Sequence, residues 1–263
     1  MLKKITISLL LSFGMTLAHA SDFSGAIDFD HGSKHYQGNW GEGSVIKNTI
    51  NVSASWTPGP WSFTLAVPYQ QMKYDFSGLI FQGSPYQRLR ATLVSKGQTV
   101  DGFGDATLSS SYTFESEEQG WWLSPGAVIK WDNGDASQGL GTNTRDFTAQ
   151  IAGGWDNSIF GIDTLIGQTW VGEDSSLATN AQPKDFGFWE LGARISPVKW
   201  MDLGVRYHDQ TKSSDQSPSN ATTEWSVAFK PAKRLSIRGY YIDYAKGPGL
   251  PKNETGLGVS YKF

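Results

Sequence analysis

The stretch Glu254-Thr-Gly-Leu-Gly-Val-Ser-Tyr-Lys-Phe263 ends the chain and decides its fold. Large apolar and aromatic side chains alternate there with small or polar ones, and the large ones are Leu257, Val259, Tyr261 and Phe263. Residues two apart lie on the same face of a β-strand, because successive side chains point to opposite faces. The stretch therefore predicts a strand with one apolar face and one polar face.

The same alternation recurs back along the chain, so the sequence predicts an all-β fold. Trp61, Phe63 and Leu65 share one face of such a segment, and Leu203 and Val205 share a face of another. Twelve strands are expected, at residues 22–30, 44–56, 61–74, 104–114, 120–132, 143–155, 159–171, 186–197, 200–210, 221–230, 233–245 and 253–263. An even number of antiparallel strands can close into a barrel with both chain ends on one side. The expected fold is a transmembrane, antiparallel, up-and-down β-barrel of twelve strands.

The connections between the expected strands alternate between short and long. The short ones are rich in turn formers and cover residues 57–60, 115–119, 156–158, 198–199 and 231–232. The long ones cover residues 31–43, 75–103, 133–142, 172–185, 211–220 and 246–252. Bacterial membrane barrels have tight periplasmic turns and longer external loops, whereas a soluble β-sandwich has no reason to separate loop lengths in this way. The alternation therefore favours a membrane barrel.

Aromatic residues gather at the ends of the expected strands. The row beside the short connections comprises Trp56, Trp61, Phe114, Trp121, Trp155, Phe160, Trp200, Phe229 and Phe263. A second row near the opposite ends comprises Trp131, Phe147, Trp170, Trp189, Tyr207, Trp225 and Tyr241. Indole and phenol rings favour the headgroup level of a bilayer. The two rows predict aromatic girdles around an outside that faces lipid.

The N-terminus indicates export from the cytoplasm. Two lysines precede an apolar stretch at residues 5–17, and Ala18-His19-Ala20 supplies the small-residue cleavage pattern. We expect residues 1–20 to be a signal peptide for the general secretory pathway and residues 21–263 to form a single transmembrane barrel domain. Without the two lysines of the signal, 20 of the 22 basic residues remain against 25 acidic ones. This mild acidity argues against a nucleic-acid partner.

The composition is that of a chain whose apolar surface is spread over alternate residues. Mean hydropathy is −0.36, yet the chain has 11 Trp, 10 Tyr, 14 Phe and 30 Gly. After the expected signal, no apolar run approaches the roughly 20 residues that a membrane helix needs. There is no cysteine, so disulfides and thiol chemistry are excluded.

Charged residues at inward strand positions are the candidates for the lining of the lumen. They are Lys130, Glu190, Arg194, Arg206, Glu224 and Arg238. A base that faces hydrocarbon at the bilayer midplane costs roughly 2–4 kcal/mol, so these charges are expected to face inward. Arg194, Arg206 and Arg238 can form a basic stripe that guides anions or hydrogen-bonds polar solutes. Alternatively, they pair with Glu190 and Glu224 and satisfy a polar interior. The sequence leaves both arrangements open.

The 29-residue connection 75–103 is too apolar for a loop that only contacts water. Its large side chains are expected to form a constriction or a binding surface for apolar solutes, and the candidates are Phe76, Leu79, Phe81 and Tyr86. Gly102 and Gly104 allow backbone conformations closed to other residues where the loop returns to the wall. Twelve strands give a lumen between a filled barrel of about eight strands and an open pore of about 16–18, so inward loops can narrow it.

No catalytic or metal-binding pattern emerges from the histidines. After the expected signal the chain has three of them, His31, His35 and His208. A hydrolase needs a nucleophile within hydrogen-bond reach of a histidine, and a third group that orients the ring. His208 with Ser213 or Ser214 is the one local candidate, and it lacks a recognisable motif. We therefore expect no enzyme activity, no cofactor and no metal site.

Three motifs resemble those of a known family. They are Leu65-Ala-Val-Pro-Tyr69, Gly102-Phe-Gly-Asp105 and Leu140-Gly-Thr-Asn-Thr-Arg-Asp146. In order and spacing they resemble the outer-membrane barrels grouped as transporters of the phenol meta-cleavage pathway, over residues 60–155. After Lys130 that family leads us to expect a Pro-Thr-Gly-like turn, and this chain has Trp131-Asp-Asn-Gly134 instead. The resemblance implies uptake of small organic compounds, aromatic ones included.

Taken together, these patterns favour an outer-membrane channel, formed by one barrel, for passive diffusion of small solutes. Its expected partners are outer-membrane lipid, the small-molecule solute and the barrel-assembly machinery. The last is expected because a terminal strand that ends on Phe263 resembles the strand that this machinery recognises. The competing hypothesis is an outer-membrane interaction or structural barrel that does not transport, with an occluded lumen and ligand-binding external loops.

Overall fold

A computed structural model describes residues 22–38, 41–82, 89–116, 119–173, 183–214, 219–245 and 249–263. The expected signal peptide, residues 1–20, and the loop candidate Tyr86 lie outside these ranges. The described residues form strands, turns and irregular connections. Among them there is no helix long and apolar enough to cross a membrane.

Sixteen strands form in the described ranges. They are β1 (Phe23–Gly38), β2 (Gly41–Trp56), β3 (Trp61–Tyr74), β4 (Gly78–Gln82), β5 (Arg90–Val94), β6 (Thr99–Phe103), β7 (Thr107–Tyr112), β8 (Phe114–Glu115), β9 (Trp121–Lys130), β10 (Asp146–Asp156), β11 (Phe160–Val171), β12 (Phe186–Val198), β13 (Met201–Gln210), β14 (Asn220–Ala232), β15 (Leu235–Tyr244) and β16 (Pro251–Lys262). Most of the long strands carry aromatic or branched apolar residues at every second position. This pattern fits strands whose two faces meet different environments.

Fourteen of these strands form one antiparallel sheet that closes into a barrel. The sheet runs from β10 to β16 and on through β1, β2, β3, β7 and β9, and β9 also pairs with β10. Strands β6, β7 and β8 share one position in the wall, because β6 and β7 pair with β3 while β7 and β8 pair with β9. The described wall therefore has twelve strand positions, and the predicted twelve-stranded barrel is confirmed. The two extra strands, β4 and β5, form a separate hairpin.

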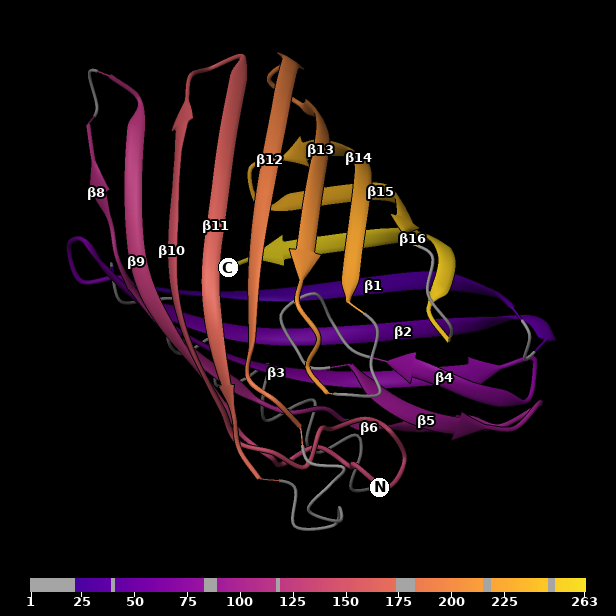
Figure 1. Ribbon diagram of the computed structural model, residues 1–263. Coiled ribbons are helices and arrows are strands. Elements are labelled where there is room, and N and C mark those ends of the chain that lie inside the picture. The colour runs from indigo at the N-terminus through magenta and orange to yellow at the C-terminus, as the bar shows by residue number, and fades with distance from the viewer. Residues whose placement is uncertain are drawn as a thin grey trace.

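Short turns and long connections lie at opposite ends of the barrel (Figure 1). The turns that join β10 to β11 and β12 to β13 lie along the upper edge of the view, and β4, β5 and β6 lie in its lower part toward the right. We call these two ends the turn end and the loop end. The segregation matches the one expected from the connection lengths.

One connection is shorter than the sequence predicts. The expected loop 31–43 is mostly strand, because β1 continues to Gly38 and β2 begins at Gly41. Above Phe29 the outward side chains become polar, beginning with His31, so the alternation that marks a half-apolar strand disappears. The backbone pairing nevertheless continues without interruption between the two strands. The paired ends of β1 and β2 therefore extend beyond the apolar part of the barrel surface.

The outside of the barrel carries a belt of exposed apolar side chains. Ile151, in the middle of β10, exposes 54% of its surface. Ring pairs mark both edges of the belt: Trp56–Phe63, Trp155–Phe160 and Trp200–Phe229 at the turn end, and Phe147–Trp170 and Trp189–Tyr207 toward the loop end. Except for Phe63, the residues of these pairs belong to the two aromatic rows that the sequence predicts. An apolar belt between aromatic edges is the surface that a bilayer requires of a barrel.

Buried apolar residues gather inside the loop end of the barrel. The cluster comprises Tyr36, Val45, Met72, Tyr74, Phe76, Ile80, Val94, Val100 and Leu140. Its members come from β1 to β6, from the connection between β3 and β4, and from the connection after β9. The interior is therefore apolar under the long loops, whereas the wall nearer the turn end carries charged and hydroxyl side chains.

Two neighbouring residues of β10 test the assignment of the faces. Ile151 is on the outside, and Gln150 occupies the inward position next to it. In lipid vesicles, Ile151→Lys is expected to lower the free energy of unfolding by about 2–4 kcal/mol, because its charge faces hydrocarbon at mid-depth. Gln150→Lys is the matched control, and its charge faces the lumen. Urea titration followed by tryptophan fluorescence measures both, and equal losses would contradict the assigned faces.

Candidate functional site

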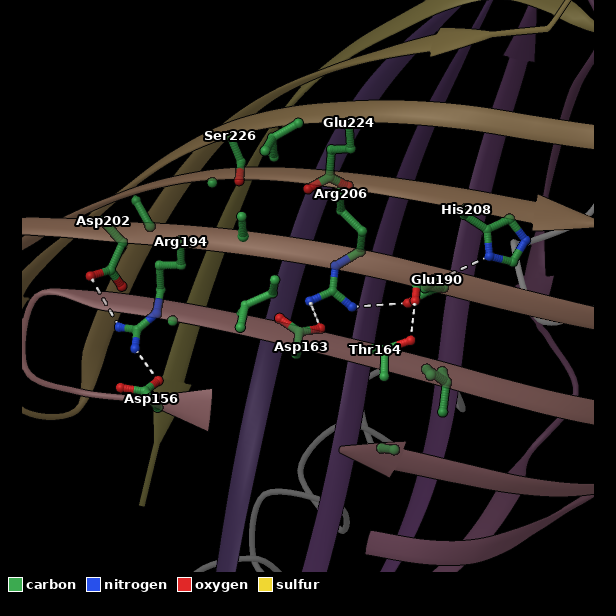
Figure 2. Close-up of a pocket in the computed structure, with 18 of the residues that line it drawn as sticks. Asp156, Asp163, Thr164, Glu190, Arg194, Asp202, Arg206, His208, Glu224 and Ser226 are labelled. Carbon is green, nitrogen blue, oxygen red and sulfur yellow. Dashed lines mark hydrogen bonds and ion pairs between the residues drawn. The ribbon is translucent and has the colours of Figure 1, made fainter. Parts of the chain in front are cut away.

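A cavity of about 780 Å³ lies inside the barrel against strands β9 to β15. Its charged lining comprises Asp156, Asp163, Glu190, Asp202, Glu224, Arg194, Arg206 and Arg238. Figure 2 shows Arg194 and Arg206 reaching from their strands toward carboxylates of the neighbouring strands. The strand period turns these residues inward while their sequence neighbours form the apolar belt.

Near the turn end, Arg194 links two carboxylates. Its guanidinium forms ion pairs with Asp156 on β10 and with Asp202 on β13, the latter at 3.6 Å. Asp202 also lies 2.5 Å from Lys230 Nζ and accepts a hydrogen bond of 2.7 Å from Ser196 Oγ. Two carboxylates therefore balance two bases across four strands.

Closer to the loop end, Arg206 links Asp163 and Glu190, at 3.0 and 2.9 Å. The side chain of Glu190 is buried, and its other oxygen lies 2.9 Å from His208 Nδ1. His208 is buried as well, and its ring stacks on Phe188. A buried carboxylate is costly unless its oxygens are bonded, and here each oxygen of Glu190 has a partner.

Each of the three lumen arginines has a carboxylate partner, since Arg238 pairs with Glu224. The geometry therefore favours ion pairing over a free basic stripe, the two arrangements that the sequence left open. The side chains of Arg194, Arg206 and Arg238 nevertheless remain 34%, 42% and 44% exposed. A guanidinium has five N–H groups, so those that the carboxylates leave unused can donate to a polar solute.

The adjoining wall of β15, β16 and β1 carries tyrosines that bind carboxylates. Tyr240 Oη donates to Asp30 Oδ1 at 2.7 Å, and Tyr244 Oη donates to Glu254 Oε2 at 2.6 Å. Lys34 Nζ lies 3.4 Å from the same oxygen of Glu254. We call the part of the lumen wall that carries Arg194, Arg206 and Arg238 the arginine wall. Hydroxyl, ammonium and carboxylate groups thus continue the polar lining beyond it.

Lys130, the sixth lumen candidate, is only 4% exposed. Its Nζ lies 3.2 Å from Asp105 Oδ2 and 3.0 Å from Asp146 Oδ2. It also donates to Thr142 Oγ1 and, at 2.8 Å, to the carbonyl oxygen of Thr144. Lys130 therefore fixes the connection between β9 and β10 to the wall, and its ammonium group is shielded from the open lumen.

Two motifs of the family resemblance meet at this ion cluster. Asp105 accepts hydrogen bonds from the backbone nitrogens of Gly134 and Thr142, at 2.9 and 2.8 Å. A Cβ atom at Gly141 would lie 2.7 Å from Asp105 Oδ1, so only glycine permits this close approach. The motifs thus fold the connection inward and place Leu140 in the apolar cluster.

The loop candidates occupy different positions around the hairpin β4–β5. Phe76 is buried, and its ring centroid lies 5.4 Å from that of Tyr36 in the apolar cluster. The backbone nitrogen of Phe81 donates to the carbonyl oxygen of Gly249 at 2.9 Å. Leu79 is partly exposed. Phe76 therefore contributes to a filled loop end, whereas Leu79 remains open to solvent or solute.

The connection between β3 and β6 crosses the mouth of the barrel. The backbone nitrogen of Leu89 donates to Ser213 Oγ at 3.1 Å, and Ser213 follows β13. Strand β13 lies six wall positions from β3, which is half of the circumference. Both residues of this contact are buried. The connection is therefore tied to the far side of the loop end.

The sequence did not single out the aspartates of the lumen wall. Asp163 lies on the same face as Leu165, which obscured the alternation of β11. Asp156 was expected in a turn, yet it is the last residue of β10 and faces inward. Asp202 is the inward residue at the start of β13 and alternates with apolar neighbours. All three aspartates could have been found from the sequence, because each lies an even number of residues from the other inward positions of its strand.

Comparison with known proteins supports the fold. No family model and no curated protein matches the sequence. The COG4313 outer membrane channel from Pseudomonas putida F1 matches with a TM-score of 0.67 and 13% identity, over 92% of this chain and 95% of that chain. The KdgM porin in complex with disordered oligogalacturonate matches with a TM-score of 0.55 and 10% identity, over 90% of this chain and 99% of that chain. This chain therefore has the barrel fold of known outer-membrane channels.

The buried cluster around Lys130 can be tested by removing its base. Lys130→Met leaves two buried carboxylates without their cation, so we expect the free energy of unfolding to fall by about 3–5 kcal/mol. Arg145→Met is the matched control, because its ion pair with Asp132 is exposed and such pairs contribute about 0–1 kcal/mol. Urea unfolding in lipid vesicles compares the two variants. Similar small losses for both would show that the cluster does not hold the loop.

Proposed function

We propose that this protein is an outer-membrane channel for passive diffusion of small organic solutes. The observation that carries the proposal is the cavity of about 780 Å³ inside a closed barrel whose outside is apolar. Five carboxylates, three arginines and several hydroxyl groups line that cavity together with apolar side chains such as Leu165 and Ile242, so it suits water and small solutes that carry polar groups. A barrel of this polarity has its favourable environment in a bilayer, with the lumen as an aqueous path.

The proposed location is the outer membrane. The apolar belt and its aromatic edges match the lipid core and its two headgroup regions. The proposal includes export by the general secretory pathway through a signal at residues 1–20, insertion by the barrel-assembly machinery, and contact with membrane lipid. The turn end then faces the periplasm and the loop end faces outward, as in other bacterial barrels.

The loop end sets the size of the solute. The hairpin β4–β5, the connection that leads to it from β3 and the connection after β9 together supply Phe76, Ile80, Val94 and Leu140 to the apolar cluster. A second cavity of about 370 Å³ lies beside them and is lined by Lys34, Lys47 and Leu140 among others. A solute that enters from outside therefore passes apolar surface before it reaches the arginine wall. This order suits small molecules that combine an apolar or aromatic body with polar groups.

The lumen supports passage better than catalysis. His208 lines the cavity, but its Nδ1 lies 2.9 Å from the buried Glu190. The hydroxyl of the candidate nucleophile Ser213 accepts a hydrogen bond from the backbone nitrogen of Leu89. Within the described ranges, no three His, Asp or Glu side chains gather in a way that could hold a metal ion. We therefore propose a non-catalytic role for the charged wall.

An occluded barrel that binds partners through its loops is the second candidate. The buried apolar cluster at the loop end is the observation that favours it, because such a cluster can also close the lumen. The two candidates differ in one measurable property, the conductance of the folded barrel.

Shortening the hairpin tests the proposed function. Deleting Ser77 to Lys96 joins Phe76 to Gly97, and Gly97 N already donates to Tyr74 O at 2.8 Å. That bond then closes a four-residue turn, and shortening a loop costs little chain entropy. We expect discrete single-channel steps from the wild type in planar bilayers and severalfold larger steps from the deletion.

The control for this test is Ser213→Ala, which keeps the hairpin and removes only its hydrogen bond from Leu89. Its conductance should stay close to that of the wild type. Wild-type and deletion barrels that are both folded and both fail to conduct would contradict the channel proposal. The occluded interaction barrel would then be the better account.

A further inference from the structure

Five cationic side chains converge at the turn end of the barrel. They line one cavity of about 550 Å³, together with Trp200, and are Lys199, Lys230, Lys233, Arg234 and Lys262. The turn after β12, the end of β14, the turn after β14 and the end of β16 contribute them. Residues far apart in the sequence thus form one concave basic surface, which we call the basic vestibule.

The basic vestibule faces the lumen side of the rim. Ser236 and Ser260 lie opposite each other on β15 and β16 at inward positions, and both line the cavity. Lys230 reaches Asp202, which belongs to the lumen network around Arg194. A solute that leaves the arginine wall toward the turn end therefore meets this surface next.

The charges of the vestibule are not balanced as those of the lumen wall are. Lys230 shares Asp202 with Arg194. For Lys199, Lys233, Arg234 and Lys262, no ion pair forms with any carboxylate of the described residues. These four side chains are also exposed. A concave surface with charges of one sign concentrates the field and attracts ions of the opposite sign.

Apart from Asp202, the inward carboxylates of the described rim do not cancel this charge. Asp28 lies on β1 opposite Ser260, one inward position deeper than Lys262, and forms no ion pair with the vestibule. Glu115 belongs to β8, which is remote from β14 to β16 in the strand order. The basic character of the vestibule is therefore local to the arc from β12 to β16.

We propose that the basic vestibule binds small solutes that carry carboxylate or phosphate groups. The charge-paired arginine wall accepts polar groups of either sign, whereas the vestibule selects anions at the turn end. Exposed lysines bind such groups weakly and exchange them rapidly, which is what passage through a pore requires. The transport consequence rests on the proposed channel function, but the binding of anions does not.

Citrate is a suitable probe, because it carries three carboxylates. Titration calorimetry on the full chain in detergent at low salt is expected to detect citrate binding and no binding of neutral glucose. The triple variant Lys199→Gln, Lys233→Gln and Lys262→Gln should bind citrate at least about tenfold more weakly, since three unpaired charges are lost. Affinity of the wild type should also fall as NaCl increases.

The matched control removes three lysines away from the turn end. Lys73→Gln, Lys96→Gln and Lys252→Gln make the same change in net charge on exposed residues of the loop end. This variant should bind citrate as the wild type does. Equal weakening in both triple variants, or none in the vestibule variant, would overturn the proposal.

Conductance of the same preparations separates this inference from the channel function. Citrate binding by a folded barrel that does not conduct would support the vestibule and contradict the channel. Conductance without citrate binding would support the channel and overturn the vestibule. The measurements on the wild type with citrate, glucose and NaCl do not depend on the variants. A wild type that does not bind citrate would therefore overturn the proposal even if the variants do not fold.

Discussion

A β-strand turns alternate side chains to opposite faces, and this constraint orders everything else in the barrel. Apolar residues such as Ile151 occupy the outside, so the charged residues between them have no place other than the interior. Charges that are crowded inside a closed wall must be bonded or remain wet. The structure does both, because Arg194 and Arg206 each pair with two carboxylates and keep part of their surface exposed. A polar lumen wall, in which each of the three arginines has a carboxylate partner, follows from that arrangement.

The loop end is held by two different kinds of interaction. A buried ion cluster on Lys130 fixes the connection after β9, and apolar packing around Phe76 and Ile80 fixes the hairpin β4–β5. The glycine-rich motifs of the sequence belong to the first kind, since Asp105 and Gly141 meet beside Lys130. They act by closing a loop onto the wall and not by contacting the cavity of the arginine wall. The size and the position of the hairpin β4–β5 and of the connection after β9 then determine how much of the lumen stays open.

The alternation of side chains made the strands of the wall predictable from the sequence. The ion-pair partners of the inward side chains could not be predicted in this way. All twelve wall positions, the even strand number and the inward direction of Arg206 follow from alternation. The pairing of Arg194 with Asp156 joins residues 38 apart in the chain and depends on the registers of two intervening strand pairs. The same holds for Lys130, whose burial depends on how the following connection folds. The upper part of β1 was missed because its outward residues are polar once they rise above the apolar belt.

The connection after β3 spans the mouth of a closed barrel and is tied to its far side by the contact between Leu89 and Ser213. The chain has no cysteine, so Leu89→Cys with Ser213→Cys introduces a single pair of thiols at that contact. Mild oxidation of the folded barrel should join the two thiols. After unfolding, the cross-linked chain should migrate faster than the reduced chain in a denaturing gel. The control pair, Leu89→Cys with Thr57→Cys at the turn end, should not cross-link. Two thiols that stay reactive toward maleimide in a correctly folded Leu89→Cys, Ser213→Cys barrel would contradict the account.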